Sequence, residues 1–215
     1  MIVCGIDESG RGAVIGNLYV AIVCIDENDY DKIGKTIKKS WLKEHEGRLR
    51  IYNFCKKFIK FEYVTYATPR EIDEYVVKGK LNKLIAEKAY ELIREAVKNI
   101  NDKIKVFVDS AHWDKFAFRK IIINLISKDV GIRERIETLY VDHKLDETNN
   151  VVILAEVVAR ICFNKHIQQL KKQLGIDIGS GYPSDYKTRT FLEKYRDKLH
   201  EFEFIRKSWS TIRYL

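Results

Sequence analysis

The chain has 215 residues, of which 46% are hydrophobic and only two are proline, so it is long enough for one folded domain and unlike a disordered protein. Its formal net charge of +8 favours an anionic partner such as nucleic acid or an acidic membrane surface, but a generally lysine-rich surface explains it equally well. No apolar stretch approaches the roughly 20 residues of a membrane span, and Asp7 comes too early for a signal peptide. We therefore expect a cytoplasmic protein with no membrane contact.

The pattern of strand and helix signals indicates an α/β protein. Strands are expected at about residues 1–6, 16–25, 58–67, 103–109 and 135–142. Helices are expected from Thr68, which has the pattern of an N-cap, at 81–100, where apolar residues recur at helical spacing, and at about 115–127, 150–173 and 188–199. Three strands come first and helices then alternate with strands, which predicts a mixed sheet.

The four cysteines stand singly in apolar surroundings, at positions 4, 24, 55 and 162. There is no close cysteine pair, and no histidine stands at ligand spacing from them. The pattern predicts small core residues and argues against both a zinc site and a disulfide framework.

Acidic residues follow three of the predicted strands, namely Asp7 and Glu8, then Asp109, then Asp142, Asp146 and Glu147. Ligand sites in open α/β sheets form beyond the carboxyl ends of strands, and neighbouring strands lie about 4.8 Å apart. Grouped carboxylates repel one another unless a cation neutralises them, and their oxygens suit Mg²⁺ or Mn²⁺. In a basic protein, such a group of acids favours metal-dependent phosphoryl chemistry. Acids also follow strands in merely solvated loops, and spacing does not identify which acids meet.

Five segments resemble those of the type 2 ribonuclease H family, ribonuclease HII, in the family's order. They are GIDESGRGAVIG (5–16), FVDS (107–110), DHKLDE (142–147), GSGYPSD (179–185) and RKSWST (206–211), and together they span nearly the whole chain. The resemblance, to an archaeal-like member, implies a ribonuclease H-like fold with a mixed five-stranded sheet flanked by helices. It also implies a single domain over residues 1–215, with a core of about 1–178 and a helical C-terminal extension of about 179–215.

The same resemblance implies a catalytic, metal-binding set of four acids, Asp7, Glu8, Asp109 and Asp146, that holds two Mg²⁺ or Mn²⁺ ions. Asp142 is the alternative for the fourth position. Enzymes of this family cut the RNA strand of RNA–DNA hybrids, including single ribonucleotides embedded in duplex DNA, and leave a 3′-hydroxyl and a 5′-phosphate. An RNA–DNA hybrid duplex is therefore the expected partner.

Two further segments correspond to family contacts with the substrate. Gly10, Arg11 and Gly12 match the residues that grip the ribose 2′-hydroxyl, the group that distinguishes RNA from DNA. Tyr182 matches a tyrosine that packs on the deoxyribose after the ribonucleotide. Taken alone, these segments would be a plain tight turn and a surface aromatic residue.

The chain departs from the family pattern in three places, of which Asn17 after Gly16, where proline is common, is expected to have little effect. KKSWLKEH (38–45) keeps Ser40 but has Lys39 and Trp41 where the family has an aspartate and a phosphate-binding lysine. In the helix predicted at 150–173, Glu156, Arg160 and Asn164 stand where a serine, a lysine and an aspartate are usual. We expect Ser40 and Arg160 to contact the substrate, although Glu156 and Arg160 also have the spacing of an ordinary ion pair in solvent.

These departures leave alternatives to an active ribonuclease. One is a catalytically weak or inactive paralogue that binds RNA–DNA hybrids. Another is a different ribonuclease H-like nuclease, against which the Gly-Arg-Gly and Tyr-Pro segments argue. No heptad seam or spare apolar face is apparent, so we expect a monomer.

Overall fold

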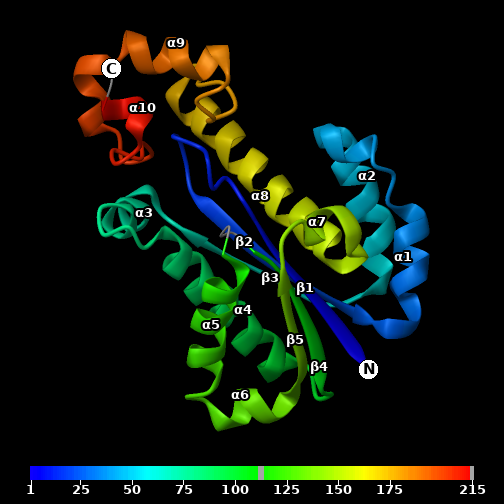
Figure 1. Ribbon diagram of the computed structural model, residues 1–215. Helices are drawn as coiled ribbons and strands as arrows, with labels where there is room; N and C mark the ends of the chain where they lie inside the picture. The colour runs from blue at the N-terminus through cyan, green and yellow to red at the C-terminus, as the bar shows by residue number, and fades with distance from the viewer. Residues whose placement is uncertain (111–113, 214–215) are drawn as a thin grey trace.

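A mixed five-stranded sheet forms the centre of the computed structural model, which describes residues 1–110 and 114–213 (Figure 1). Its strands are β1 (Ile2–Ser9), β2 (Leu18–Asp26), β3 (Ile59–Ala67), β4 (Ile104–Asp109) and β5 (Ile136–Asp142), in the spatial order β3-β2-β1-β4-β5. β2 is antiparallel to both β1 and β3, whereas β1, β4 and β5 are parallel. The expected sheet is confirmed, and the carboxyl ends of β1, β4 and β5 lie along one edge of it.

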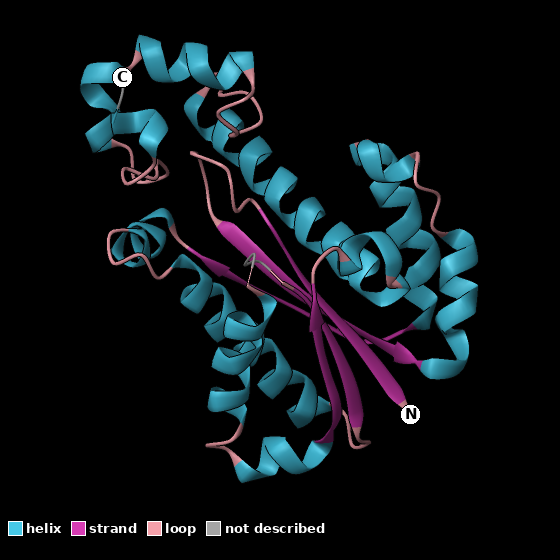
Figure 2. Ribbon diagram, in the orientation of Figure 1, coloured by secondary structure: helices cyan, strands magenta, loops and turns pink. Residues whose placement is uncertain are grey.

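Helices cover both faces of the sheet (Figure 2). Those on one face are α3 (Pro69–Val76), α4 (Leu81–Asn99), α5 (Lys115–Ile126) and α6 (Val130–Arg135). Those on the other are α1 (Tyr30–Thr36), α2 (His45–Cys55) and α8 (Asn150–Leu174). Because side chains alternate along a strand, β1 sends Cys4 and Ile6 into the first layer and Val3 into the second, which explains why the strand is apolar throughout.

The longer helices lie where their apolar spacing predicts them. Thr68 caps α3 by accepting a hydrogen bond from the Glu71 amide at 3.3 Å, the arrangement that its sequence indicates. The last predicted helix is instead α9 (Tyr186–Lys194) followed by a 3₁₀ helix, η4 (Arg196–Glu201). Short elements α7 (Leu145–Thr148), α10 (Ser210–Arg213), η1 (Glu27–Asp29), η2 (Trp41–Lys43) and η3 (Lys56–Phe58) complete the described structure.

The sequence patterns did not predict α1 and α2. Helix α2 buries only Gly47, Ile51 and Cys55, a narrow stripe at intervals of four residues that is too sparse to mark an amphipathic helix. Gly47 is needed there, because a Cβ atom at this position would lie 2.2 Å from the carbonyl oxygen of Trp41.

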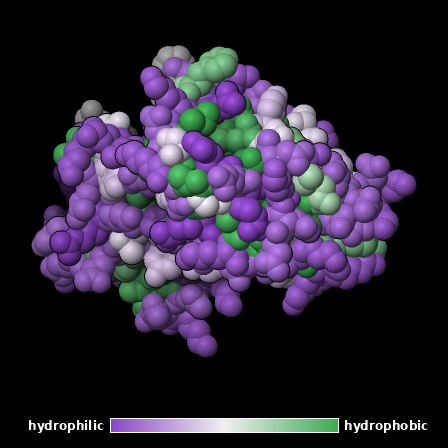
Figure 3. Space-filling model, turned by 90° about the horizontal axis from the view of Figure 1, so that it is seen from below, coloured by the Kyte–Doolittle hydropathy of each residue, from purple (hydrophilic) through white to green (hydrophobic). Residues whose placement is uncertain are grey.

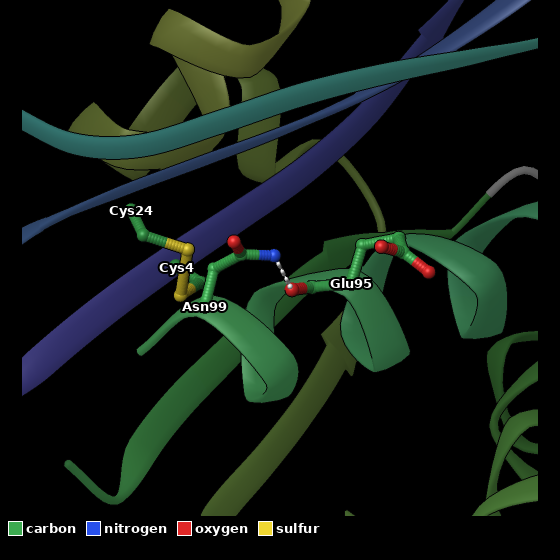
Figure 4. The surroundings of a disulfide bond; sticks show 4 residues. All are labelled: Cys4, Cys24, Glu95 and Asn99. Atoms are coloured by element: carbon green, nitrogen blue, oxygen red, sulfur yellow. Dashed lines mark hydrogen bonds between the residues drawn. A yellow bond between two sulfur atoms is a disulfide. The ribbon is translucent and has the colours of Figure 1, made fainter. Parts of the chain in front are cut away.

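A disulfide joins Cys4 of β1 to Cys24 of β2, so the expectation that cysteines form no disulfide is wrong (Figure 4). The two residues are 20 apart in sequence but are direct partners in the antiparallel register. Both are fully buried in the layer that α4 covers, and Figure 4 draws them with Glu95 and Asn99 of that helix. The free cysteines are Cys55, which is buried as expected, and Cys162, which is partly exposed. Sheet register, rather than spacing along the chain, created the pair.

A third hydrophobic cluster joins the loop after β1, the C-terminal half of α8 and the residues that follow α8. Ile15 of the loop and Ile205 form an isolated antiparallel bridge. In Figure 1 the blue loop rises toward the orange and red C-terminal segments, which are largely helical as expected. The last two residues of the predicted extension lie outside the described residues, and its boundary near residue 178 stays a prediction.

The surface seen from below is mostly hydrophilic, with hydrophobic residues in small groups among hydrophilic ones (Figure 3). Within residues 1–110 and 114–213, no helix has the length and apolar character needed to cross a bilayer.

Candidate active site

Four carboxylates that the sequence singled out gather at one edge of the sheet. Asp7 and Glu8 lie in the last three residues of β1, and Asp109 ends the parallel neighbour β4. The register pairs Ile6 with Val108, one step before Asp7 and Asp109. The amide of Leu145 donates a 2.7 Å hydrogen bond to Asp109 Oδ1, which holds the first turn of α7, and hence Asp146, against β4. The structure therefore brings all four predicted acids into one neighbourhood.

The pKa values of these acids are raised by burial first and by their mutual repulsion second. Burial is the largest cause in each case: it holds the pKa of Asp7 well above its ordinary value and raises that of Glu8 to about 7 and that of Asp109 to about 6. Repulsion from neighbouring carboxylates adds to each shift, from Glu8 and Asp109 on Asp7 and from Asp146 on Asp109. The pKa of Asp146 is raised as well, by burial and then by Glu147.

This donor set fits a divalent cation. The site concentrates hard carboxylate oxygens, and Asp7 is only 6% exposed, so the ionised groups are stabilised by little water. A bound cation would remove the repulsion that raises these pKa values.

Asp142, the alternative fourth acid, lies in a different environment. It is the register partner of Asp109, yet its side chain accepts hydrogen bonds from Lys115 Nζ at 2.7 Å, the Tyr140 hydroxyl at 2.9 Å and the His143 amide at 2.8 Å. These contacts, that of Lys115 first, lower the pKa of Asp142 to about 2. Because Asp142 is already neutralised by protein groups, the arrangement supports Asp146 as the fourth member of the site.

The Gly-Arg-Gly segment lies directly beyond β1, beside Tyr182. Gly10 has a φ of +86°, and a Cβ there would lie 2.6 Å from the Phe163 ring, so only glycine fits. The Phe163 ring in turn meets Tyr182 edge-on, with 5.4 Å between ring centroids. Arg11 donates from Nη2 to Asn82 Oδ1 at 2.8 Å. Two motifs that are about 170 residues apart in sequence thus form one surface next to the acids.

Arg160 of α8 connects this surface to the acidic site. Its Nη1 donates to the Tyr182 hydroxyl at 2.7 Å, and its Nε donates to Glu156 Oε1 at 3.3 Å. The ion pair that the helical spacing suggested therefore exists, but both side chains are largely buried, and Glu156 contributes to the raised pKa of Asp7. The pair faces the site instead of solvent.

A pocket of about 600 Å³ next to the acids contains residues that sequence reasoning missed. Basic and acidic side chains share its lining, among them Lys39, Arg48, Asp146, Glu156 and Arg160. Arg48 comes from the unpredicted helix α2, its buried Nε has no hydrogen-bond partner, and burial lowers its pKa. No motif marked Arg48, nor Asn82, the partner of Arg11.

Other predicted residues lie less centrally. Ser40 is exposed and lies outside the set that lines this pocket, although its neighbour Lys39 belongs to it. Asn164 hydrogen-bonds to His45 at 3.2 Å. A larger pocket of about 810 Å³ lies between α3, α8 and residues 203–207, and none of the four acids lines it.

The sequence model of the family described as Ribonuclease HII matches residues 4–212. The chain belongs to the ribonuclease HII family. A ribonuclease HII from Methanococcus vannielii is 32% identical over 213 residues, covering 98% of this chain and 83% of that protein. The crystal structure of ribonuclease H2 from Pyrococcus horikoshii OT3 superposes with a TM-score of 0.76 at 30% identity, covering 100% of this chain and 96% of that one.

A further neighbour is a structure of the PCNA:RNase HII complex from Archaeoglobus fulgidus. It has a TM-score of 0.77 at 27% identity and covers 98% of this chain and 96% of that one. These relatives confirm the resemblance to an archaeal-like member and the ribonuclease H-like fold. As a ribonuclease HII, the chain is a hydrolase that acts as an endonuclease on RNA–DNA hybrids, and members of this family need divalent metal ions.

Proposed function

We propose that this ribonuclease HII cleaves the RNA strand of RNA–DNA hybrids, including a single ribonucleotide embedded in duplex DNA, and leaves a 3′-hydroxyl and a 5′-phosphate. The observation that carries the proposal is the placing of four carboxylates directly beside the Gly10–Gly12 segment and Tyr182. The acids supply the chemistry, and the adjacent surface supplies the selection of a ribose.

In this proposal Asp7, Glu8, Asp109 and Asp146 would hold two Mg²⁺ or Mn²⁺ ions. When bound, such ions activate a water molecule and stabilise the charge that develops on the leaving oxygen. Within residues 1–110 and 114–213, no three histidine, cysteine or carboxylate side chains already surround one ion-sized position, so two-ion binding rests on the chemistry of the donor set.

The remaining residues would position the substrate. The backbone of Gly10, Arg11 and Gly12 can approach a ribose closely because two of these residues carry no side chain. The Tyr182 ring would pack on the following deoxyribose, and Arg160 fixes that ring through its hydroxyl. Arg160 and the exposed Ser40 would also contact the backbone phosphates.

The test compares three duplexes of one sequence: all DNA, DNA with one ribonucleotide, and an RNA–DNA hybrid, each with Mg²⁺ and with Mn²⁺. We expect cuts in the second and third only, and extension of the upstream product by a DNA polymerase would show its 3′-hydroxyl. The Asp7→Asn variant is the matched inactive control. Binding of the hybrid with no cut under either metal would favour the alternative, an inactive hybrid-binding paralogue.

We also propose that the protein is cytoplasmic and monomeric, and that its partner is the duplex itself. Association with PCNA is a property of the Archaeoglobus fulgidus relative. Sedimentation of the purified chain with and without a hybrid duplex tests the monomer, and a stable dimer in the free protein would contradict it.

A further inference from the structure

Among the described residues, Arg206 has the largest side chain that the fold buries completely, with 0% of its surface exposed. Burying a guanidinium is costly unless a counter-charge or several hydrogen bonds replace its water. In the described part of the chain no carboxylate lies within ion-pair distance of Arg206, and burial lowers its pKa to about 9.

The guanidinium bridges two points of the loop between β1 and β2. Its Nε donates to the carbonyl oxygen of Gly16 at 2.9 Å, and its Nη1 donates to that of Arg11 at 3.1 Å. The carbon of the guanidinium also lies over the Trp209 ring, 5.0 Å from the ring centroid. A guanidinium is planar and rigid, so two donors on it hold the two carbonyls at a set separation and orientation.

The loop has little structure of its own to keep this shape. Gly10 and Gly16, near its two ends, both have positive φ angles. Within the loop, the Ala13 amide donates a hydrogen bond to the carbonyl oxygen of Gly10. Its other backbone hydrogen bonds join it to remote segments. The amides of Val14 and Ile15 donate to the carbonyl oxygen of Gly181, and the amide of Gly16 donates to that of Phe204. The carbonyl oxygen of Val14 accepts from the amide of Arg206. Since Gly181 precedes Tyr182, the same contacts fix the loop relative to that tyrosine.

The segment that carries Arg206 is itself anchored on the far side. The Asp73 carboxylate of α3 accepts hydrogen bonds from the Lys207 amide at 2.8 Å, the Ser208 amide at 3.0 Å and the Ser208 hydroxyl. Asp73 therefore holds the segment while Arg206 holds the loop. Neither contact involves the four acids.

From this geometry we propose that Arg206 is a positioning residue for ribose recognition: it holds the Gly10–Gly12 backbone, through the Arg11 carbonyl, in the orientation that meets a 2′-hydroxyl. The inference rests on the proposed function. Under this inference, two properties have different origins. The basic surface provides affinity for any duplex, and the loop provides the preference for a duplex that contains a ribose.

The experiment measures binding by fluorescence anisotropy with Ca²⁺ in place of Mg²⁺, for a duplex with one ribonucleotide and for the same duplex in DNA alone. The readout, for wild type, Arg206→Met and Arg206→Lys, is the dissociation constant of the all-DNA duplex divided by that of the ribonucleotide duplex. We expect Arg206→Met to lower the ratio about tenfold, as lost buried hydrogen bonds would, with the all-DNA constant within about twofold of wild type. Arg206→Lys keeps the charge but has no planar pair of donors to hold both carbonyls, so its ratio should fall between those of wild type and Arg206→Met. Arg196→Gln, an exposed change on η4, is the matched control and should leave the ratio unchanged.

Asp73→Ala provides a second route if Arg206→Met does not fold, because it loosens the segment and leaves Arg206 in place. It should lower the same ratio by a smaller factor. An unchanged ratio in the folded Arg206 variants would overturn the inference. If those variants do not fold, an unchanged ratio in Asp73→Ala would overturn it. An equal fall in the affinities for both duplexes would also overturn it, because that result indicates a merely structural role. A wild type with no preference for the ribonucleotide duplex would overturn the proposed function first, so the two failures are distinguishable.

Discussion

The ends of β4 and β5 carry the same residue at paired positions, yet the two aspartates have opposite properties. Asp109 is half-buried among other carboxylates, and its pKa is raised to about 6. Its partner Asp142 is held by Lys115 and Tyr140, and its pKa is lowered to about 2. The backbone brings both to the same edge, and the groups contributed by other elements decide which one is available to a metal ion. A position at the end of a strand therefore does not by itself identify a site residue.

The sharpest test of this comparison is activity. Asp109→Asn should reduce cleavage of an RNA–DNA hybrid by more than about a hundredfold, because it removes an anionic ligand from the proposed metal site. Asp142→Asn should change the rate by less than about threefold. Initial rates on one labelled hybrid with Mg²⁺ measure both, and equal losses in the two variants would abolish the distinction.

Stabilisation by metal should show the same contrast. An ion at about one hundred times its dissociation constant stabilises the folded state by about 2.7 kcal/mol, which corresponds to about 5–10 °C in melting temperature for a chain of this size. We expect Mn²⁺ to raise the melting temperature of wild type and of Asp142→Asn by this amount, and that of Asp109→Asn by much less. Calorimetry with Mg²⁺, Mn²⁺ and EDTA provides the measurement.

The pH dependence of stability should have opposite signs for the two aspartates. Folding raises the pKa of Asp109 from 3.8 to about 6, so its contribution is complete below about pH 4 and is lost as the pH rises through 6. Folding lowers the pKa of Asp142 to about 2, so its contribution is present above about pH 4 and is lost as the pH falls toward 2.

Urea unfolding in EDTA at several pH values measures this difference. The free energy of unfolding of Asp109→Asn, relative to that of wild type, should increase as the pH rises from about 4 to 7. That of Asp142→Asn should be lower than that of wild type by a constant amount over the same range. A constant difference for Asp109→Asn would show that its pKa is not raised.

The smallest effect is expected from the partner of Asp142. Lys115→Met removes a partly exposed ion pair, so the free energy of unfolding should fall by less than about 1 kcal/mol. The pKa of Asp142, followed by NMR, should rise toward its ordinary value. If the variant also lost hybrid cleavage, Lys115 would have a role beyond neutralising Asp142.

Much of the fold and the acidic site could be predicted because both depend on local pattern. Asp7 and Asp109 lie at the carboxyl-terminal ends of buried strands, and parallel pairing of those strands suffices to bring them together. The Thr68 cap and the apolar stripe of α4 are local in the same sense.

The features that escaped prediction depend on contacts between distant segments. The Cys4–Cys24 disulfide requires the antiparallel register of β1 and β2, and Arg48 reaches the pocket only because α2 packs on α8. The buried position of Arg206 likewise follows from the docking of the C-terminal segment on the loop after β1. Charge and spacing along the chain carry no information about such pairings.

The bonds between the loop after β1 and Arg206 also constrain how the protein matures during translation. Gly16 and Arg206, which one of these hydrogen bonds joins, are 190 residues apart. At about 5–20 residues per second, a ribosome needs about ten to forty seconds to add Arg206 after Gly16. During that interval β1 and its carboxylates can already be present while the loop lacks its anchor. Competence to discriminate sugars would therefore be one of the last properties that a newly made molecule acquires.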